Sequence, residues 1–213
     1  LVLLCGVLAG PVRAGQVHLL ALGDSLTQGY GLIEQEGFVP QLRAWLAERG
    51  HDVRLVNGGV SGDTTRGGLS RVDWSLTDDV DAMIVTLGGN DILRGLDPAE
   101  TRRNLDGILQ AGQAKGVEML LIGLEASGNY GPEYKREFDA IYPDLAERYD
   151  TVYARNFFAG LPVQGDPTAV VDLMQADGIH PNARGVALNI KAMEPTLRAF
   201  MQRLTEVSTQ SGG

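Results

Sequence analysis

Short apolar segments recur along the chain and alternate with longer segments in which apolar residues are spaced three or four positions apart. Most of the short segments are nearly continuous in Val, Ile and Leu, which is typical of strands covered on both faces, as in a parallel sheet. They predict five strands, the last of them weaker, at 17–22, 53–56, 82–87, 118–124 and 151–154.

The longer segments have helical periodicity. They predict helices at 38–49, 97–115 and 133–149, and a last helix that starts near Ala183. Pro143 should bend or restart the third of these helices, and Pro195 should kink the last. Alternating strands and helices predict an α/β protein: a three-layer αβα sandwich around a central, mostly parallel five-stranded sheet. In such sheets the ligand site lies outside the carboxyl ends of the strands.

Residues 1–14 form a separate segment at the start of the chain. An apolar run is followed by the small residue Ala14, with Val12 two positions earlier, which resembles a signal-peptidase site. We therefore expect a signal-peptide remnant at 1–14, a single domain at 15–206 and a flexible tail at 207–213. Cleavage near Ala14 would give a periplasmic or secreted protein. The alternative is an apolar strand or helix that docks on the domain; the run is too short to span a bilayer, so no stable membrane insertion is expected.

Charge and composition narrow the chemistry. The formal net charge of -9 over 213 residues leads us to expect no binding of nucleic acid. The only cysteine is Cys5, and the three histidines are His18, His51 and His180. These counts exclude disulfide scaffolds, thiolate zinc sites and most multi-histidine metal centres. We expect no metal and no organic cofactor. Chemistry has to come from hydroxyl groups, carboxylates or one of the imidazoles.

Ser25 follows the first predicted strand. The turn that Gly23 permits would place Ser25 at the start of a helix, whose free N–H groups and positive dipole end stabilise negative charge. A serine at that position can equally be a helix cap and nothing more. The Gly-x-Ser-x-Gly elbow is absent, because Thr27 occupies the position of its second glycine.

Two further loops carry groups that can donate hydrogen bonds into the same crevice. Gly62, after the second predicted strand, can present its N–H without a Cβ in the way, and Asn90, after the third, carries a side-chain amide. Both residues also fit ordinary turns, and Ser61 and Thr64 are expected to be caps or turn formers.

Asp177 and His180 stand just before the final helix. A carboxylate three residues before an imidazole can accept its Nδ1–H bond and leave Nε2 free as a base, although a loop histidine is often merely exposed. Both residues fall on the same side of the sheet as Ser25, whereas His18 and His51 fall on the opposite side.

Four sequence blocks resemble, in order and spacing, those of the SGNH (GDSL) hydrolase family. They are Gly-Asp-Ser-Leu at 23–26, Gly-Val-Ser-Gly-Asp-Thr at 59–64, Gly-Gly-Asn-Asp at 88–91 and Asp-Gly-Ile-His-Pro at 177–181. The chain is more closely similar to the branch of bacterial thioesterase I/lysophospholipase L1 and arylesterases, including Asn-Tyr-Gly at 129–131 and Ile-Tyr-Pro at 141–143. The resemblance covers about 16–204.

This resemblance implies a serine ester hydrolase of flavodoxin-like SGNH fold that works through an acyl-enzyme intermediate. Ser25 would be the nucleophile, His180 the general base and then acid, and Asp177 the carboxylate that orients His180. The oxyanion hole would consist of the Ser25 N–H, the Gly62 N–H and the Asn90 side-chain amide, which are donors placed where negative charge develops.

The resemblance leaves the ester open among aryl, acyl, thio- and lysophospholipid esters, so the expected partner is a small-molecule or lipid ester. The loop 125–132 is expected to form one wall of the acyl pocket and to help set acyl-chain length. Asp24, Asn129 and Tyr130 are expected at the substrate site, Asp24 chiefly as a support for its loop. Two alternatives stay open: a carbohydrate O-acetyl esterase of the same fold, and a non-catalytic flavodoxin-like module that holds a phosphate or sugar.

Overall fold

The computed structural model of the chain describes residues 15–162 and 167–210. Its centre is a sheet in which every strand pair is parallel, in the order β2-β1-β3-β4-β5. The strands are β1 (Val17–Gly23), β2 (Val53–Gly59), β3 (Ala82–Thr86), β4 (Glu118–Ile122) and β5 (Val152–Ala154). The strand order reverses between β1 and β3, and a ligand crevice is expected at such a point.

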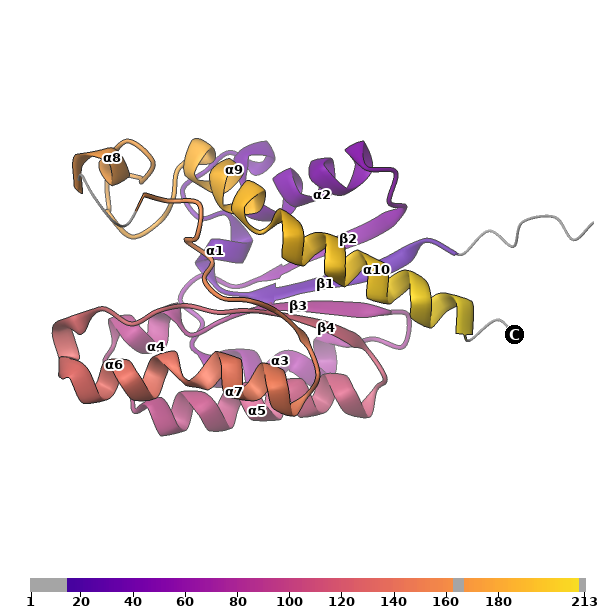
Figure 1. Ribbon diagram of the computed structural model, residues 1–213, viewed down its shortest axis with the longest axis horizontal. Coiled ribbons are helices and arrows are strands. Elements are labelled where there is room, and N and C mark those ends of the chain that lie inside the picture. The colour runs from indigo at the N-terminus through magenta and orange to yellow at the C-terminus, as the bar shows by residue number, and fades with distance from the viewer. Residues whose placement is uncertain (1–14, 163–166, 211–213) are drawn as a thin grey trace, which may run out of the picture.

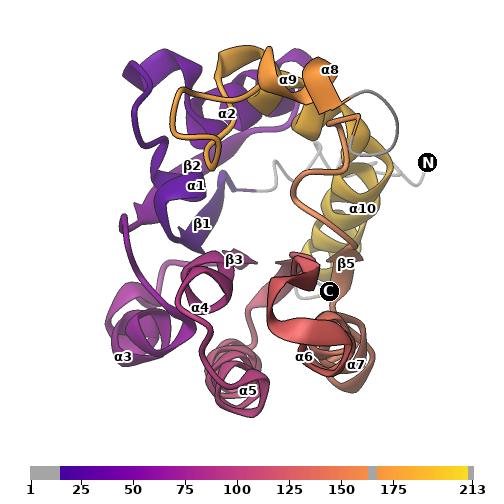
Figure 2. The ribbon, with the colours of Figure 1, turned by 90° about the vertical axis from the view of Figure 1, so that its left-hand side faces the viewer.

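Helices cover both faces of this sheet and give the three layers seen from the side in Figure 1 and end-on in Figure 2. One face carries α2 (Phe38–Glu48), α9 (Ala183–Ala192) and α10 (Glu194–Gln210). The other carries α3 (Thr65–Ser75), α5 (Pro98–Ala114), α6 (Gly131–Asp139) and α7 (Ile141–Arg148). The shorter elements are α1 (Ser25–Gln28), η1 (Glu34–Glu36), α4 (Gly89–Leu93), η2 (Gly128–Tyr130) and α8 (Pro167–Val171). The predicted fold class is confirmed.

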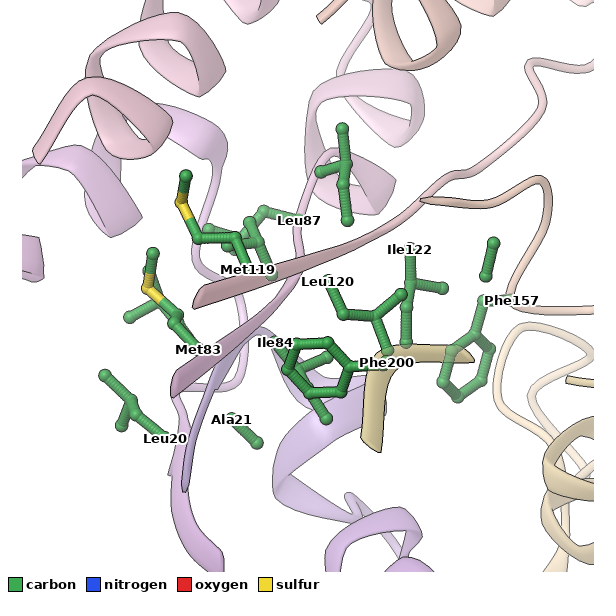
Figure 3. Close-up of a cluster of buried hydrophobic side chains, with 14 of the residues drawn as sticks. Leu20, Ala21, Met83, Ile84, Leu87, Met119, Leu120, Ile122, Phe157 and Phe200 are labelled. Carbon is green, nitrogen blue, oxygen red and sulfur yellow. The ribbon is translucent and has the colours of Figure 1, made fainter. Parts of the chain in front are cut away.

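The hydrophobic core lies on both sides of the central strands. Every residue of β3 is buried, as expected for a strand covered by helices on both faces. Figure 3 shows the alternation: Met83 and Met119 point to one side of the strands, whereas Ile84 and Leu120 point to the other, where the ring of Phe200 from α10 packs. A helix long and apolar enough to cross a membrane does not occur within the described ranges.

The edge strand β2 differs from its prediction in length and burial. It extends to Gly59, because its backbone pairs with β1 as far as the Gly23–Gly59 step. Residues 57–59, expected in a loop, therefore belong to the strand, and the loop starts at Val60. As β2 pairs with β1 alone, its residues Arg54 and Val56 are exposed rather than covered.

The two predicted helices that were expected to bend at a proline are each divided two or three residues before it. The predicted helix 133–149 consists of α6 and α7, separated at Ala140, and Pro143 lies in the first turn of α7. The predicted last helix consists of α9 and α10, separated at Met193, with Pro195 in the first turn of α10. Proline lacks an N–H and fits a first turn, where that N–H has no helical partner.

The expected domain limits, 1–14 at the start and 207–213 at the end, can be compared with the structure only where it describes those residues. Helix α10 continues to Gln210, so 207–210, expected in a flexible tail, are helical. α10 packs against β4 and β5, and its buried residues Leu197, Phe200, Met201 and Leu204 all precede 207–210. The expected signal remnant at 1–14 and the last three residues lie outside the described residues.

Ile84→Ala should lower the free energy of unfolding by about 2 to 5 kcal/mol, because Ile84 is 1% exposed in the central strand and its truncation leaves a cavity. Ile33→Ala is the matched control: Ile33 is 64% exposed, and its truncation should change stability by less than about 0.5 kcal/mol. Urea unfolding of both variants checks this. Equal losses would mean that the central strand is not the packed core.

Candidate active site

Three side chains from distant parts of the chain meet at the edge of the sheet where β1 ends. His180 Nδ1 lies 2.6 Å from Asp177 Oδ2, and His180 Nε2 lies 2.7 Å from Ser25 Oγ. When Nδ1 carries the proton and donates a hydrogen bond to the carboxylate, Nε2 is unprotonated and can accept a hydrogen bond from the Ser25 hydroxyl. The structure therefore brings the predicted serine, histidine and aspartate into one hydrogen-bonded chain.

Close packing around Gly23 places Ser25 at the end of the strand. A Cβ on Gly23 would collide with the side chain of Thr27 and the carbonyl group of Thr86, so α1 and β3 pack directly on this residue. Ser25 is the first residue of α1, and Asp24 is its N-cap, accepting a hydrogen bond from the helix backbone at 3.0 Å.

Asp177 shapes the loop that carries His180. Its Oδ1 accepts the backbone N–H groups of Ile179 at 2.9 Å and His180 at 3.0 Å. The backbone bond from His180 is the main cause that lowers the pKa of Asp177 from 3.8 to about 2, followed by the bond from the imidazole and the bond from Ile179. Asp177 is consequently ionised at neutral pH and presents a charged acceptor to the imidazole.

Gly62 and Asn90 lie on neighbouring segments that contact each other. The turn Val60–Asp63 is closed by a bond from Asp63 N–H to the Val60 carbonyl at 3.1 Å. Gly62 has a φ of +84°, which suits the third position of a type II turn and favours glycine. Asn90, on α4, donates from Nδ2 to the Asp63 carbonyl at 2.9 Å. The expected donors are therefore adjacent, and Thr64 caps α3 as expected.

A pocket of about 150 Å³ opens beside Ser25, Asn90 and His180. Its other walls are mostly apolar: Leu26, Ile92, Leu93, Leu124, Phe158 and Ile179, with Glu125 at the rim and Asp24 and Gly89 below. Gly62 lies beside the pocket rather than in its wall.

The apolar wall residues were not predicted individually from the sequence. They come one or two at a time from separate loops, so no periodicity marks them. The one available signal is position, because Leu93 and Ile179 are large apolar residues next to the Asn90 and His180 motifs and stay 55% and 42% exposed. Phe158 lies in a stretch whose sequence carries no motif.

Asn129 and Tyr130 do not line this pocket. They belong to η2, and the Tyr130 hydroxyl donates to the Leu93 carbonyl at 3.4 Å while its ring packs over Gly95. Tyr130 thus touches the pocket wall from behind. Of the loop expected to form a wall, Glu125 lines the pocket.

Asp24 is 1% exposed and sits beneath the pocket. Its Oδ2 accepts the Asn90 amide at 3.4 Å, so this carboxylate joins α1 to α4 in addition to capping α1. Burial is the largest influence on Asp24 and raises its pKa from 3.8 to about 6.

The other histidines lie away from this pocket. His18 starts β1, and its Nδ1 lies 3.0 Å from Asp79 Oδ2; His51 stands in the turn between α2 and β2. Both are at the amino ends of strands, opposite the pocket. Over the described ranges, no group of three or more His, Cys, Asp or Glu side chains could hold a metal ion.

Known proteins resemble this chain over most of its length. The model of the GDSL-like lipase/acylhydrolase family matches residues 21–188. Esterase TesA of Pseudomonas aeruginosa is 38% identical over 191 residues, which are 89% of this chain and 92% of that protein. Thioesterase 1/protease 1/lysophospholipase L1 of Escherichia coli K12 is 37% identical over 166 residues, 77% of this chain and 75% of that protein. The crystal structure of AlinE4, an SGNH-hydrolase family esterase, superposes with a TM-score of 0.71 at 43% identity, over 86% of this chain and 96% of that one.

A three-layer αβα sandwich with a serine bonded to a histidine at the reversal of strand order is the architecture of an SGNH-type hydrolase. The chain belongs to the GDSL-like lipase/acylhydrolase family. It is a carboxylic ester hydrolase, and its substrate is a small molecule. Membership of this family argues against the alternative of a non-catalytic binding module.

Substituting Asp24 by Asn should change the pH dependence of stability. With a pKa near 6 when folded and 3.8 as its ordinary value, Asp24 binds a proton in the folded chain that the unfolded chain releases. The contribution of Asp24 to the free energy of unfolding of the wild type is therefore fully present below about pH 4, and it is lost as pH rises through about 6. The stability of Asp24→Asn relative to wild type should rise by about 2 kcal/mol between about pH 4 and pH 8. Urea unfolding at both pH values measures this; a difference independent of pH would contradict it.

Proposed function

We propose that Ser25 is the nucleophile of this ester hydrolase, with His180 as general base and then general acid and Asp177 as the carboxylate that orients it. The observation that carries this proposal is the pair of hydrogen bonds, 2.6 Å and 2.7 Å long, that links Asp177 through His180 to Ser25 Oγ. A base within hydrogen-bond reach of a hydroxyl, itself oriented by a third group, is the geometry that activates a serine.

In the proposed reaction, Ser25 Oγ attacks the ester carbonyl carbon while His180 Nε2 takes the hydroxyl proton. The tetrahedral intermediate collapses when the imidazolium gives this proton to the leaving alcohol or thiol, which leaves an acyl group on Ser25. A water molecule then attacks the acyl carbon while the same nitrogen takes its proton. The imidazolium returns this proton to Ser25 Oγ as the bond between Oγ and the acyl carbon breaks, which releases the acid and restores the free serine. Asp177 keeps its charge in both steps because its pKa lies far below neutral pH, and this charge stabilises the imidazolium. No metal or organic cofactor takes part in this scheme.

The oxyanion hole is proposed to consist of the Ser25 N–H, the Gly62 N–H and the Asn90 side-chain amide. An asparagine amide has two N–H bonds. Asn90 Nδ2 donates to the Asp63 carbonyl at 2.9 Å and makes a longer contact of 3.4 Å to Asp24 Oδ2. Because the amide is planar, its two N–H bonds move together, so we propose that a small rotation of the whole amide exchanges the longer contact for the substrate oxygen. Preorganised donors of this kind stabilise charge as it forms.

We also propose that the pocket holds the acyl group and that it suits short chains. A cavity of about 150 Å³ lined by Leu, Ile and Phe is large enough for benzene. The pocket beside Ser25 has that volume and a similar lining, so it accommodates about six carbon atoms. Longer chains would pass Glu125, whose carboxylate pairs with Arg155 Nε at 3.0 Å, and gain no further apolar burial. This favours aryl and short acyl esters over carbohydrate acetates, which fill little of the pocket.

For the whole chain we propose a mature hydrolase domain at 15–206, periplasmic or secreted after cleavage near Ala14. The small residue Ala14, with Val12 two positions before it and an apolar run upstream, supports cleavage there. The absence of cysteine downstream of Cys5 suits an oxidising compartment.

Ser25→Ala should abolish hydrolysis of p-nitrophenyl butyrate and leave the folded structure intact, because the hydroxyl group contributes little packing at the edge of the sheet. Ser127→Ala is the control: this exposed serine lies outside the pocket, and its loss should leave kcat/KM within about twofold of wild type. Circular dichroism checks folding. Turnover by purified Ser25→Ala at a tenth or more of the wild-type rate would refute the proposal that Ser25 is the nucleophile.

The volume of the acyl pocket predicts how kcat/KM depends on chain length in p-nitrophenyl esters from acetyl to dodecanoyl, with a break at the length that fills the pocket. Each methylene that enters the pocket should raise kcat/KM by up to about fourfold, from about 0.8 kcal/mol of burial, until about six carbons, after which the values should level off. Phe158→Ala enlarges the pocket and should move the break to longer chains. Trp74→Ala, at a position on α3 that is 84% exposed and does not line this pocket, should not move it. A steady rise to dodecanoyl in the wild type would show that the pocket does not set the limit.

A further inference from the structure

The three proposed oxyanion donors lie on three separate segments: α1, the turn Val60–Asp63, and α4. Such donors are effective when they are held in place before charge develops, within about 0.5 Å of the productive geometry. Ser25 and Asn90 belong to helices. Gly62 instead stands in an exposed turn, and glycine has the freest backbone and no side chain to anchor it. Its position depends on contacts from other segments.

Arg94 makes one of these contacts. Its Nη2 donates to the carbonyl oxygen of Gly62 at 2.8 Å. Arg94 closes α4, four residues after Asn90, and its backbone N–H donates to the Asn90 carbonyl at 3.1 Å. The same short helix thus contacts the turn twice, through the Asn90 amide on the Asp63 carbonyl and through the Arg94 guanidinium on Gly62.

Arg71, on α3, holds the other side of the turn. Its Nε donates to Asp63 Oδ2 at 2.8 Å, and its Nη2 donates to the Gly23 carbonyl at 2.8 Å. Both Arg71 and Asp63 have side chains that are 19% exposed, so this charged pair is shielded from water and is stronger than a surface ion pair. Arg71 thereby joins the turn to the residue two positions before Ser25.

We propose that Arg94 is a positioning residue that, together with Arg71, fixes the turn Val60–Asp63 so that the Gly62 N–H is directed at the substrate carbonyl oxygen. Each arginine ties the turn to a segment that carries another donor, Arg94 to the helix of Asn90 and Arg71 to the strand end before Ser25. This inference rests on the proposed role of Gly62 in the oxyanion hole.

The exposure of Arg94 admits a different role, in which its guanidinium binds an anionic group of the substrate. The two roles differ in what they change. A residue that orients an oxyanion donor affects kcat for every ester, including neutral ones, whereas a residue that binds a substrate anion affects KM for anionic esters alone.

The test uses Arg94→Gln in the full chain with p-nitrophenyl butyrate, a neutral ester. We expect kcat to fall about 5- to 30-fold, a part of the 10² to 10³ that removal of one donor costs, while KM stays within about twofold. A butyl trifluoromethyl ketone, whose adduct with a serine carries an oxyanion, should lose affinity in the same proportion. Arg94→Lys should recover part of the loss. Arg136→Gln is the control, since this arginine of α6 is 69% exposed and pairs with Glu133.

The same substitution is then made in a Gly62→Ala background, after thermal unfolding has shown that each variant folds. If Arg94 acts through Gly62, its loss should lower kcat less than twofold there, because the donor is already misplaced. Arg71→Lys is a second test of the same turn. Lysine lacks the planar guanidinium that bonds both Asp63 Oδ2 and the Gly23 carbonyl, so kcat should fall while KM changes little.

Three outcomes would overturn the proposal: kcat of Arg94→Gln within twofold of wild type, equal losses with and without Gly62→Ala, or an effect confined to KM for anionic esters. Failure of the proposed function has a different signature, because Ser25→Ala would then keep its turnover whatever Arg94 does. The two failures are therefore distinguishable with the same substrate.

Discussion

Close packing at Gly23 is the constraint on which the rest of the site depends. β1 runs between β2 and β3, and at its last residue the absence of a Cβ lets α1 and β3 approach the backbone. The carbonyl oxygen of the same residue accepts the Val60 N–H at 3.0 Å and the Arg71 guanidinium at 2.8 Å. A single residue thus connects the strand that ends at Ser25 with the turn that carries Gly62.

Two aspartates of the site, Asp24 and Asp177, have opposite pKa shifts because their surroundings differ. Asp24 is enclosed beneath the pocket, and burial raises its pKa to about 6. Asp177 lies near the surface, and three hydrogen bonds lower its pKa to about 2. The first supports the helix of the serine at a cost in stability above its pKa, and the second maintains a charge beside the imidazole.

The sheet and the residues that meet at its edge were predictable because both follow from strong regularities. Continuous apolar runs mark the central strands, and parallel strands bring their carboxyl ends together, which places Ser25, Asn90 and His180 on one side. The pocket wall was not predictable, because Phe158 and Leu93 are isolated apolar residues whose neighbours are set by loop conformation. The same holds for Arg94, whose partner is a backbone carbonyl that no side-chain pattern reveals.

The hydrogen bond between Ser25 and His180 joins residues 155 positions apart, and it has a consequence for biosynthesis. The nucleophile leaves the ribosome early, in the first βα unit, whereas the base and its carboxylate emerge after all five strands of the sheet. With the proposed roles, a growing or C-terminally clipped chain has the serine but no base, and it is hydrolytically silent.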